Sequence, residues 1–190
     1  MRDPLDRYYT PRLLAEACIV WLWRHASATG PLVDPCAGGG SWLDAAEAYG
    51  WRAMGCDIDP GAPAVREGRA DLSPMLEWSP PAPSVWWVTN PPYGPVEEWI
   101  QELRRRQVQR ADHGVALLMR LTAVEWLMEL DDRPNLLGTT SQRARWEGPG
   151  GALHGASDTC GAVLAVWMGL KRATCTTIAP IPQWRPRGRR

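Results

Sequence analysis

The strongest constraint on the fold is a regular alternation of short apolar segments with longer segments whose apolar residues recur at helical spacing. The apolar segments predict strands at 30–35, 51–59, 83–90, 113–121 and 160–170. The periodic segments predict helices at 11–26, after the glycine loop within 38–50, and at 60–68, 95–111 and 122–130. Strands that alternate with helices favour an α/β fold, a doubly wound and mostly parallel sheet with helices on both faces.

The C-terminal part departs from this alternation. Residues 171–190 contain one more short apolar stretch, and no helical segment separates it from the strand at 160–170. We therefore expect an antiparallel hairpin at the end of the sheet. The chain of 190 residues predicts a single domain over 1–184, followed by a basic, disordered tail at 185–190. The helix at 11–26 should begin with Thr10 as the capping residue and Pro11 in the first helical position.

Nothing in the sequence predicts a membrane span or a secretory signal. No apolar run reaches about 18 residues, and the first residues, "MRDPLDRYYTP", lack an apolar core. The cytoplasm is therefore the expected compartment. Five cysteines show neither a CxxC pair nor a histidine spacing suited to zinc, so we expect reduced thiols and no metal site.

Arginine is unevenly distributed along a chain whose formal net charge is +0. Of 21 cationic residues, only Lys171 is a lysine, and arginines cluster in "LRRRQVQR" (103–110) and "RPRGRR" (185–190). A compositional bias toward arginine explains the excess. The clustering also leaves phosphate contact open, because guanidinium groups match phosphate oxygens in geometry.

A glycine loop, "VDPCAGGGSW" (33–42), joins the first strand to the next helix. Ligands of doubly wound sheets bind beyond such strand ends. The loop lacks the Gly-Lys-Ser/Thr of nucleotide hydrolases and does not match GxGxxG. Asp34 precedes the glycines, and its carboxylate would repel a phosphate but suit a cationic amino group.

Two further acids follow the next strands. Asp57 ends the second strand, where an acid commonly receives ribose hydroxyls, and Ile58 beside it can contact an adenine face. Asp71 could accept from an adenine amino group, or it could simply cap a turn. A cofactor with ribose, adenine and an ammonium group but no phosphates fits this set, and S-adenosylmethionine is such a molecule.

A rigid turn, "VTNPPYGP" (88–95), ends the fourth strand, because proline cannot continue a strand ladder. Together, "DPCAGGG" and the later "NPPY" resemble the class I methyltransferases that modify the exocyclic amine of adenine in nucleic acids. The motif "YYTP" (8–11) is similar to the segment that those enzymes place over the methionine end of the cofactor. The C-terminal segments 115–126, 141–146 and 157–167 resemble small phage and bacterial adenine DNA methyltransferases, which implies a bacterial or phage origin.

The resemblance implies the roles of individual residues. Asn90, Pro91, Pro92 and Tyr93 would form the catalytic turn: the Asn90 side-chain carbonyl and the Pro91 backbone carbonyl accept the amine hydrogens, and Tyr93 stacks on a flipped-out base. Besides Asp34, Asp57, Ile58, Asp71 and Asn90, the implied cofactor-binding residues are Tyr9, Thr10, Pro11, Pro35, Cys36, Ala37, Gly38 and Gly40.

Little chain remains after the NPPY motif for a separate target-recognition domain. Short loops, self-association or a partner protein would then select the nucleic acid. Arg143, Arg145 and Trp146 could contact phosphate and stack a base, although an ordinary surface loop explains them equally. DNA is the expected substrate. The alternatives are an adenine methyltransferase of RNA, a methyltransferase of a protein glutamine amide, whose glycine loop usually reads "DLGTGSG", and a catalytically silent nucleic-acid-binding subunit.

Overall fold

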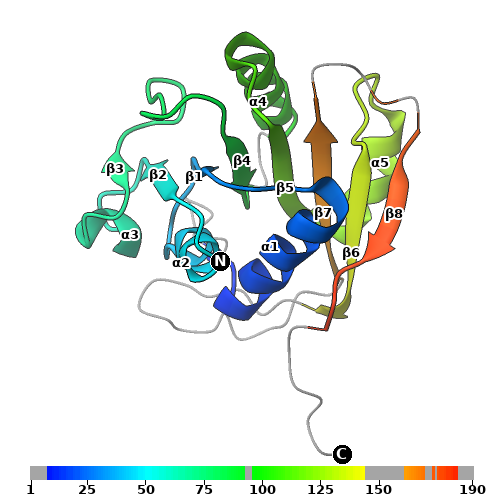
Figure 1. The fold of residues 1–190 in the computed structure, drawn as a ribbon, viewed down its shortest axis with the longest axis horizontal. Coiled ribbons are helices and arrows are strands. Elements are labelled where there is room, and N and C mark those ends of the chain that lie inside the picture. Colours follow the sequence, from blue (N-terminus) through cyan, green and yellow to red (C-terminus); the bar gives the residue numbers. More distant parts are fainter. Residues whose placement is uncertain (1–7, 93–95, 144–160, 170–172, 174, 184–190) are drawn as a thin grey trace, which may run out of the picture.

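Eight strands form one sheet in a computed structural model, which describes residues 8–92, 96–143, 161–169, 173 and 175–183, without the side chains of 141–143. The order across the sheet is β3-β2-β1-β4-β5-β7-β6-β8 (Figure 1). The strands are β1 (Leu32–Asp34), β2 (Ala53–Asp57), β3 (Asp71–Leu72), β4 (Trp86–Thr89), β5 (Gly114–Arg120), β6 (Leu136–Arg143), β7 (Gly161–Met168) and β8 (Thr177–Pro180).

Strand directions confirm the predicted mostly parallel sheet with an antiparallel strand near the C-terminus. Strands β3, β2, β1, β4 and β5 pair in parallel, whereas β7 runs antiparallel to both β5 and β6. The winding direction reverses between β1 and β4, since the chain proceeds outward to β3 on one side and to β5 on the other. In open α/β sheets, ligands bind at such a switch point, beyond the carboxyl ends of the strands.

Helices cover both faces of the sheet (Figure 1). They are α1 (Arg12–Ala26), α2 (Ser41–Ala48), α3 (Pro63–Arg66), α4 (Val96–Arg110) and α5 (Val124–Glu129), with a 3-10 turn, η1 (Leu121–Ala123), before α5. Helices α1, α2 and α3 pack on one face, and α4 and α5 pack on the other. Each face therefore has its own apolar core, as the doubly wound arrangement requires.

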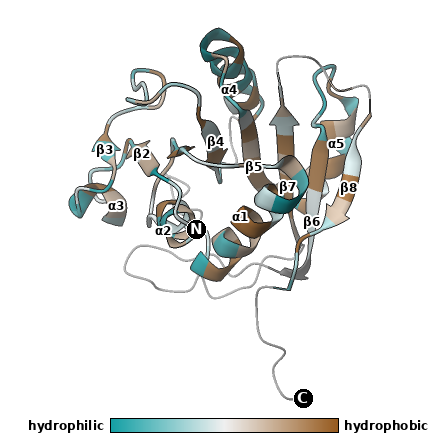
Figure 2. Ribbon diagram, viewed as in Figure 1, coloured by the Kyte–Doolittle hydropathy of each residue, from teal (hydrophilic) through white to brown (hydrophobic). Residues whose placement is uncertain are grey.

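Strand β5 shows how the sequence builds both cores. Val115, Leu117 and Met119 belong to the α4 side, while Ala116 and Leu118 belong to the α1 side. Successive side chains of a strand point to opposite faces, so a strand buried on both sides is a continuous apolar run. Figure 2 shows this run as hydrophobic along β5, in contrast to the hydrophilic outer end of α4.

The expected C-terminal hairpin is wrong. Strand β6, which we did not predict, lies beside β7, and β8 joins the far side of β6 in parallel. The segment "LLGTTSQR" contains a glycine and several polar residues, so its composition conceals a strand. The predicted tail at 185–190 lies outside the described residues.

The start of α1 also differs from the expectation. The helix begins at Arg12, Pro11 is the residue before it, and no side chain caps it. The Pro11 carbonyl accepts hydrogen bonds from the backbone N–H groups of Leu14 and Ala15 at 2.9 and 3.1 Å. Thr10 is therefore not the cap, and its buried side chain is available for another role.

The connection from β3 to β4 is a helix-free segment over residues 73–85, with only a short turn near its start. It contains four prolines, which disfavour a helix interior. Within the described ranges, every helix is too short or too polar to cross a bilayer.

Candidate functional site

A cavity of about 300 Å³ lies at the carboxyl ends of β1, β2 and β4, where the sheet changes winding direction. This volume is at the lower end of the range for small-molecule sites, about 300–1,000 Å³. Three segments predicted to form the site meet there: 8–10 before α1, the glycine loop after β1, and the turn after β4. The lining residues are Tyr8, Tyr9, Thr10, Pro35, Cys36, Ala37, Gly38, Gly39, Ser41, Trp42, Asp57, Ile58, Asp59, Ala62, Pro74, Met75, Leu76, Asn90, Pro92, Glu98, Trp99 and Glu102.

Asp57 connects the end of β2 to the glycine loop. Its Oδ2 accepts a hydrogen bond from the Gly38 N–H at 2.8 Å, and its Oδ1 accepts one from the Asp59 N–H at 2.8 Å. Burial raises the pKa of Asp57, although both hydrogen bonds oppose the shift. Each carboxylate oxygen can accept a second hydrogen bond, so Asp57 can shape the loop and still receive ribose hydroxyls.

The ring of Tyr9 lies against the glycine loop. A Cβ atom at Gly38 would come within 2.7 Å of Tyr9 Cδ1, and one at Gly39 within 3.3 Å of Tyr9 Cδ2. Gly38 also has a φ of 48°, in the left-handed region. The sequence suggested that these glycines admit a ligand, whereas the structure shows that they also admit an aromatic ring of the chain itself.

Asp34 is fully buried behind the loop. Its Oδ1 accepts hydrogen bonds from the Cys36 N–H at 3.1 Å and the Thr89 hydroxyl at 2.7 Å. Its Oδ2 is buried and has no hydrogen-bond partner in the described part of the chain. Burial raises the pKa of Asp34 to about 7, against the opposing effect of the Thr89 hydrogen bond. A buried oxygen without a partner costs about 1–3 kcal/mol and marks a candidate ligand contact.

Asn90 follows the last residue of β4. Its side-chain Nδ2 donates a hydrogen bond to the Tyr8 carbonyl at 2.9 Å. Because a carbonyl can only accept, this bond fixes the amide orientation and directs Oδ1 elsewhere. Oδ1 is buried without a partner among the residues that the structure describes. Asn90 thus brings an oriented, unsatisfied acceptor to the wall of the cavity.

The structure brings together ten of the predicted site residues. The cavity wall contains Tyr9, Thr10, Pro35, Cys36, Ala37, Gly38, Asp57, Ile58, Asn90 and Pro92. Other predicted residues do not line it, namely Pro11, Asp34, Gly40, Asp71 and Pro91. Tyr93, Arg145 and Trp146 lie outside the described residues, and Arg143 is described only as the end of β6.

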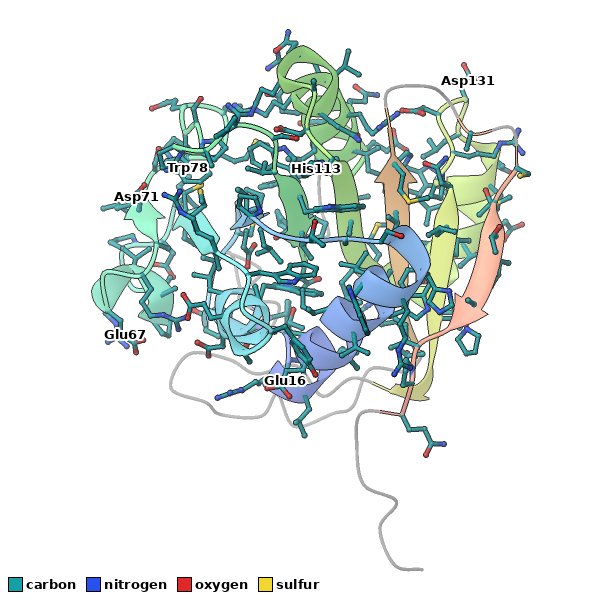
Figure 3. The ribbon with its side chains drawn as sticks, viewed as in Figure 1. Glu16, Glu67, Asp71, Trp78, His113 and Asp131 are labelled. Carbon is teal, nitrogen blue, oxygen red and sulfur yellow. The ribbon has the colours of Figure 1, made fainter. Side chains whose placement is uncertain are left out.

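Asp71 has a structural partner that the sequence did not suggest. Its Oδ2 accepts a hydrogen bond from the Trp78 indole N–H at 2.7 Å, and the two side chains lie close together beside β3 (Figure 3). Asp71 is exposed, whereas Trp78 is only 7% exposed. The structure therefore supports an anchoring role for Asp71, toward the segment that follows β3.

The arginines of α4 make internal contacts. Arg104 and Arg106 are buried, and exposed Arg105 pairs with Glu102 at 2.6 Å. Arg110 donates to the Ala82 carbonyl at 2.6 Å and contacts Asp112 at 3.0 Å. These contacts favour the structural explanation of the 103–110 cluster over phosphate binding.

Sequence reasoning missed one wall of the cavity. It consists of Pro74, Met75 and Leu76 from the helix-free segment, and of Glu98, Trp99 and Glu102 from α4. Leu76 is 68% exposed, so this wall presents apolar surface next to the equally exposed Ile58. The available signal in the sequence was Met75 and Leu76, an apolar pair shortly after the strand that ends at Leu72. Within the described residues, no group of three or more His, Cys, Asp or Glu side chains could hold a metal ion.

No protein-family model matches the chain, and no curated protein matches it. Solved structures do match. A candidate RNA methyltransferase from Pyrococcus horikoshii is 15% identical, with a TM-score of 0.64 over 90% of this chain and 93% of that chain. A candidate class I S-adenosylmethionine-dependent methyltransferase from Listeria monocytogenes is 10% identical, with a TM-score of 0.57 over 94% of this chain and 67% of that chain.

A third match is the modification subunit of a candidate type I restriction enzyme from Vibrio vulnificus. It is 14% identical, with a TM-score of 0.54 over 96% of this chain and 48% of that chain, so this chain spans about half its length. Together with the strand order, these similarities show that the chain has the class I methyltransferase fold.

Proposed function

We propose that the protein transfers a methyl group from S-adenosylmethionine to the exocyclic amine of adenine in DNA. The observation that carries this proposal is the Asn90 side chain. Its Oδ1 is a buried acceptor without a partner in the described structure, at the carboxyl end of β4 beside the glycine loop. An acceptor at that position suits an amine whose N–H group donates a hydrogen bond while the nitrogen attacks the methyl group.

The residues around the cavity fit S-adenosylmethionine. Asp57 would receive the ribose hydroxyls, and Ile58 and Leu76 offer apolar surface to the adenine ring. Oδ2 of Asp34, which is buried without a partner in the described structure, would pair with the ammonium group. Thr10, which is 4% exposed, lines the cavity beside the glycine loop and would contact the methionine end.

The chain itself would activate the amine. When bound, S-adenosylmethionine supplies an electrophilic methyl group on its sulfonium. The amine of adenine is a poor nucleophile, because its lone pair is delocalised into the ring. Oδ1 of Asn90 and the Pro91 carbonyl would accept hydrogen bonds from its two N–H groups, make the nitrogen more pyramidal and stabilise the positive charge that develops. The Tyr8 carbonyl holds Asn90 in the orientation that this requires.

The prolines of the turn would preserve this geometry. Pro91 is buried and Pro92 lines the cavity, and their fixed φ angles limit motion of the acceptor pair. We assign base stacking to Tyr93, and contacts to the nucleic acid to Arg143, Arg145 and Trp146. A base within a duplex would have to flip out to reach the turn.

RNA is the second candidate substrate. The solved structure with a TM-score of 0.64 is a candidate RNA methyltransferase, and its length closely matches that of this chain. The sequence resemblance to small adenine methyltransferases of phages and bacteria favours DNA. Slight sequence specificity, or a partner protein that supplies it, is part of the proposal.

A transfer assay tests the substrate class. The protein would be incubated with methyl-labelled S-adenosylmethionine and duplex DNA, single-stranded DNA, ribosomal and transfer RNA, or a protein extract. The products would be digested and read by mass spectrometry. Labelled N6-methyladenine from DNA is the expected result. Label in RNA alone would move the assignment to RNA, label in glutamine to the protein class, and cofactor binding without any label would indicate a silent subunit.

A further inference from the structure

The wall of the cavity at residues 74–76 belongs to a segment that lacks regular secondary structure. Over residues 73–85 the chain forms no helix. The described hydrogen bonds within it are short-range and all go to the Pro74 carbonyl, from the Glu77 and Trp78 N–H groups and the Ser73 hydroxyl. Backbone carbonyls in such a segment need partners from elsewhere in the protein. The position of this cavity wall therefore depends on hydrogen bonds that other parts of the protein make to the segment.

Arg106 of α4 supplies two of these anchors. Its Nη1 donates to the Trp78 carbonyl at 2.6 Å, and its Nη2 donates to the Leu76 carbonyl at 2.8 Å. The guanidinium carbon lies 5.9 Å from the centre of the Trp87 ring, within reach of a cation–π contact. A single side chain thus holds the segment at two points, two residues apart.

The same guanidinium also contacts the part of this wall that α4 forms. Its Nε donates to Oε1 of Glu102 at 2.7 Å, and Glu102 lines the cavity from α4. Hydrogen bonds from Arg105 and Arg106 lower the pKa of Glu102 to about 2, so the carboxylate is ionised at neutral pH. Arg106 is 7% exposed, and a charged hydrogen bond at such a site is worth more than one in water.

We propose that Arg106 is a positioning residue for the adenine end of the cofactor cavity. By joining the carbonyls of Leu76 and Trp78 to Glu102, it sets the separation between the two parts of this wall, Pro74–Leu76 and α4. Arg106 itself does not line the cavity. The inference rests on the proposed function, because it assumes that S-adenosylmethionine occupies this cavity.

The geometry requires arginine and not merely a positive charge. The planar guanidinium directs three different nitrogens at three acceptors. Lysine has one compact ammonium group on a flexible stem, so it can keep the ion pair with Glu102 but cannot hold both carbonyls in place. The Arg106→Lys variant should therefore restore only part of the effect of arginine.

Arg104 provides a matched control on the same helix. It is also 7% exposed and forms an ion pair with Asp132 at 2.7 Å. It donates to the Gly169 carbonyl at 3.2 Å as well. None of its partners lines the cavity. Loss of either arginine removes buried hydrogen bonds, but only loss of Arg106 frees a cavity wall.

The experiment compares Arg106→Met, Arg106→Lys and Arg104→Met in the full-length protein. Binding of S-adenosylmethionine would be measured by calorimetry, and steady-state transfer would give KM and kcat. We expect Arg106→Met to weaken binding about tenfold and raise KM to match, with kcat at saturation within about twofold of wild type. Arg106→Lys should fall between, and Arg104→Met should bind within about twofold of wild type despite a similar loss of thermal stability.

If Arg106→Met does not fold, amide hydrogen exchange in the Arg106→Lys variant still tests the inference. Amide exchange of the 74–82 peptide should be faster in Arg106→Lys than in wild type and unchanged in Arg104→Met. Equal binding by Arg106→Lys and wild type, with equal exchange of this peptide, would overturn the inference, as would equal losses of affinity in Arg104→Met and Arg106→Met. Failure of the wild-type protein itself to bind S-adenosylmethionine would instead overturn the proposed function.

Discussion

The Thr89 hydroxyl donates a 2.7 Å hydrogen bond to Oδ1 of Asp34, across 55 residues of sequence and in a fully buried environment. Thr89 ends β4 directly before Asn90, and Asp34 ends β1 directly before the glycine loop. The same oxygen also accepts the Cys36 N–H of that loop. One carboxylate oxygen therefore ties the proposed cofactor loop to the proposed catalytic turn.

This relationship predicts a stability loss in Thr89→Val. Valine keeps the shape of threonine but removes the donor, so Oδ1 of Asp34 retains only the Cys36 N–H. Removing one partner from a buried acceptor costs about 1–3 kcal/mol, and we expect a loss of about 2 kcal/mol in the free energy of unfolding. Urea denaturation measures it. Thr89→Ser keeps the hydroxyl and is the control, so equal stabilities of the two variants would refute the role of the bond.

Asp34 predicts a pH dependence of stability. Its pKa rises from 3.8 in the unfolded chain to about 7 in the fold, because burial disfavours the charged form. The native state therefore binds the proton more tightly. This contribution is fully present below pH 4 and is lost as the pH rises to 7, at no more than about 1.4 kcal/mol per pH unit. Asp57, with a raised pKa, adds a dependence of the same sign.

The comparison of wild type with Asp34→Asn isolates this titration, since Asp57 is common to both proteins. Thermal or urea unfolding between pH 5 and pH 7.5 should show wild type losing stability relative to the variant. Parallel stability curves over that window would show that Asp34 does not titrate there. Glu102, whose pKa is lowered to about 2, changes stability only at more acidic pH.

Gly38→Ala should impair both folding and cofactor binding. The added Cβ would meet Tyr9 Cδ1 at 2.7 Å, and the left-handed φ of 48° costs about 1–2 kcal/mol for a residue with a side chain. Gly68→Ala is the control, because Gly68 has a φ of 69° and nothing within 4 Å of its Cβ position. Calorimetry should show weaker S-adenosylmethionine binding for Gly38→Ala alone. Equal affinities of both variants would argue against a role of Tyr9 in the cavity wall.

Asp71 is expected to act through Trp78. If its function is to hold the Trp78 indole, then Asp71→Ala and Trp78→Phe should weaken S-adenosylmethionine binding to a similar extent, and the double variant should be no worse than either single one. Direct recognition of adenine by Asp71 predicts a different result. In that case Asp71→Ala would still lose affinity in the Trp78→Phe background.

Much of the fold could be predicted because strand and helix periodicities are clear in this chain. The helix at 95–111 is observed at Val96–Arg110, and the strand at 113–121 at Gly114–Arg120. The strand at 51–59 is shorter, at Ala53–Asp57, since hydrogen bonding to β1 and β3 ends there. Each of these segments has an apolar pattern of its own that predicts its secondary structure, because its apolar residues must be buried wherever the segment lies in the fold.

What the sequence concealed depends on contacts between distant segments. Strand β6 contains Gly138, where a side chain would crowd Ile181 and Trp21. The reason for a glycine within this strand is therefore visible only in the folded structure. The pairing of Asp71 with Trp78 and the anchoring by Arg106 likewise join segments without a shared motif. The motif residues of the site could be found because each motif is a short continuous stretch of sequence. The wall formed by Pro74–Leu76 and α4 could not, because it joins two segments that share no motif.

The most direct test of the account is single-turnover methyl transfer to DNA by Asn90→Ala, measured together with S-adenosylmethionine binding. Wild type should place the label on the N6 atom of adenine. The variant should bind the cofactor within about threefold of wild type but transfer at least about a hundredfold more slowly, the typical cost of one lost transition-state hydrogen bond. Transfer at the wild-type rate by Asn90→Ala would contradict the proposed role of the buried Asn90 oxygen.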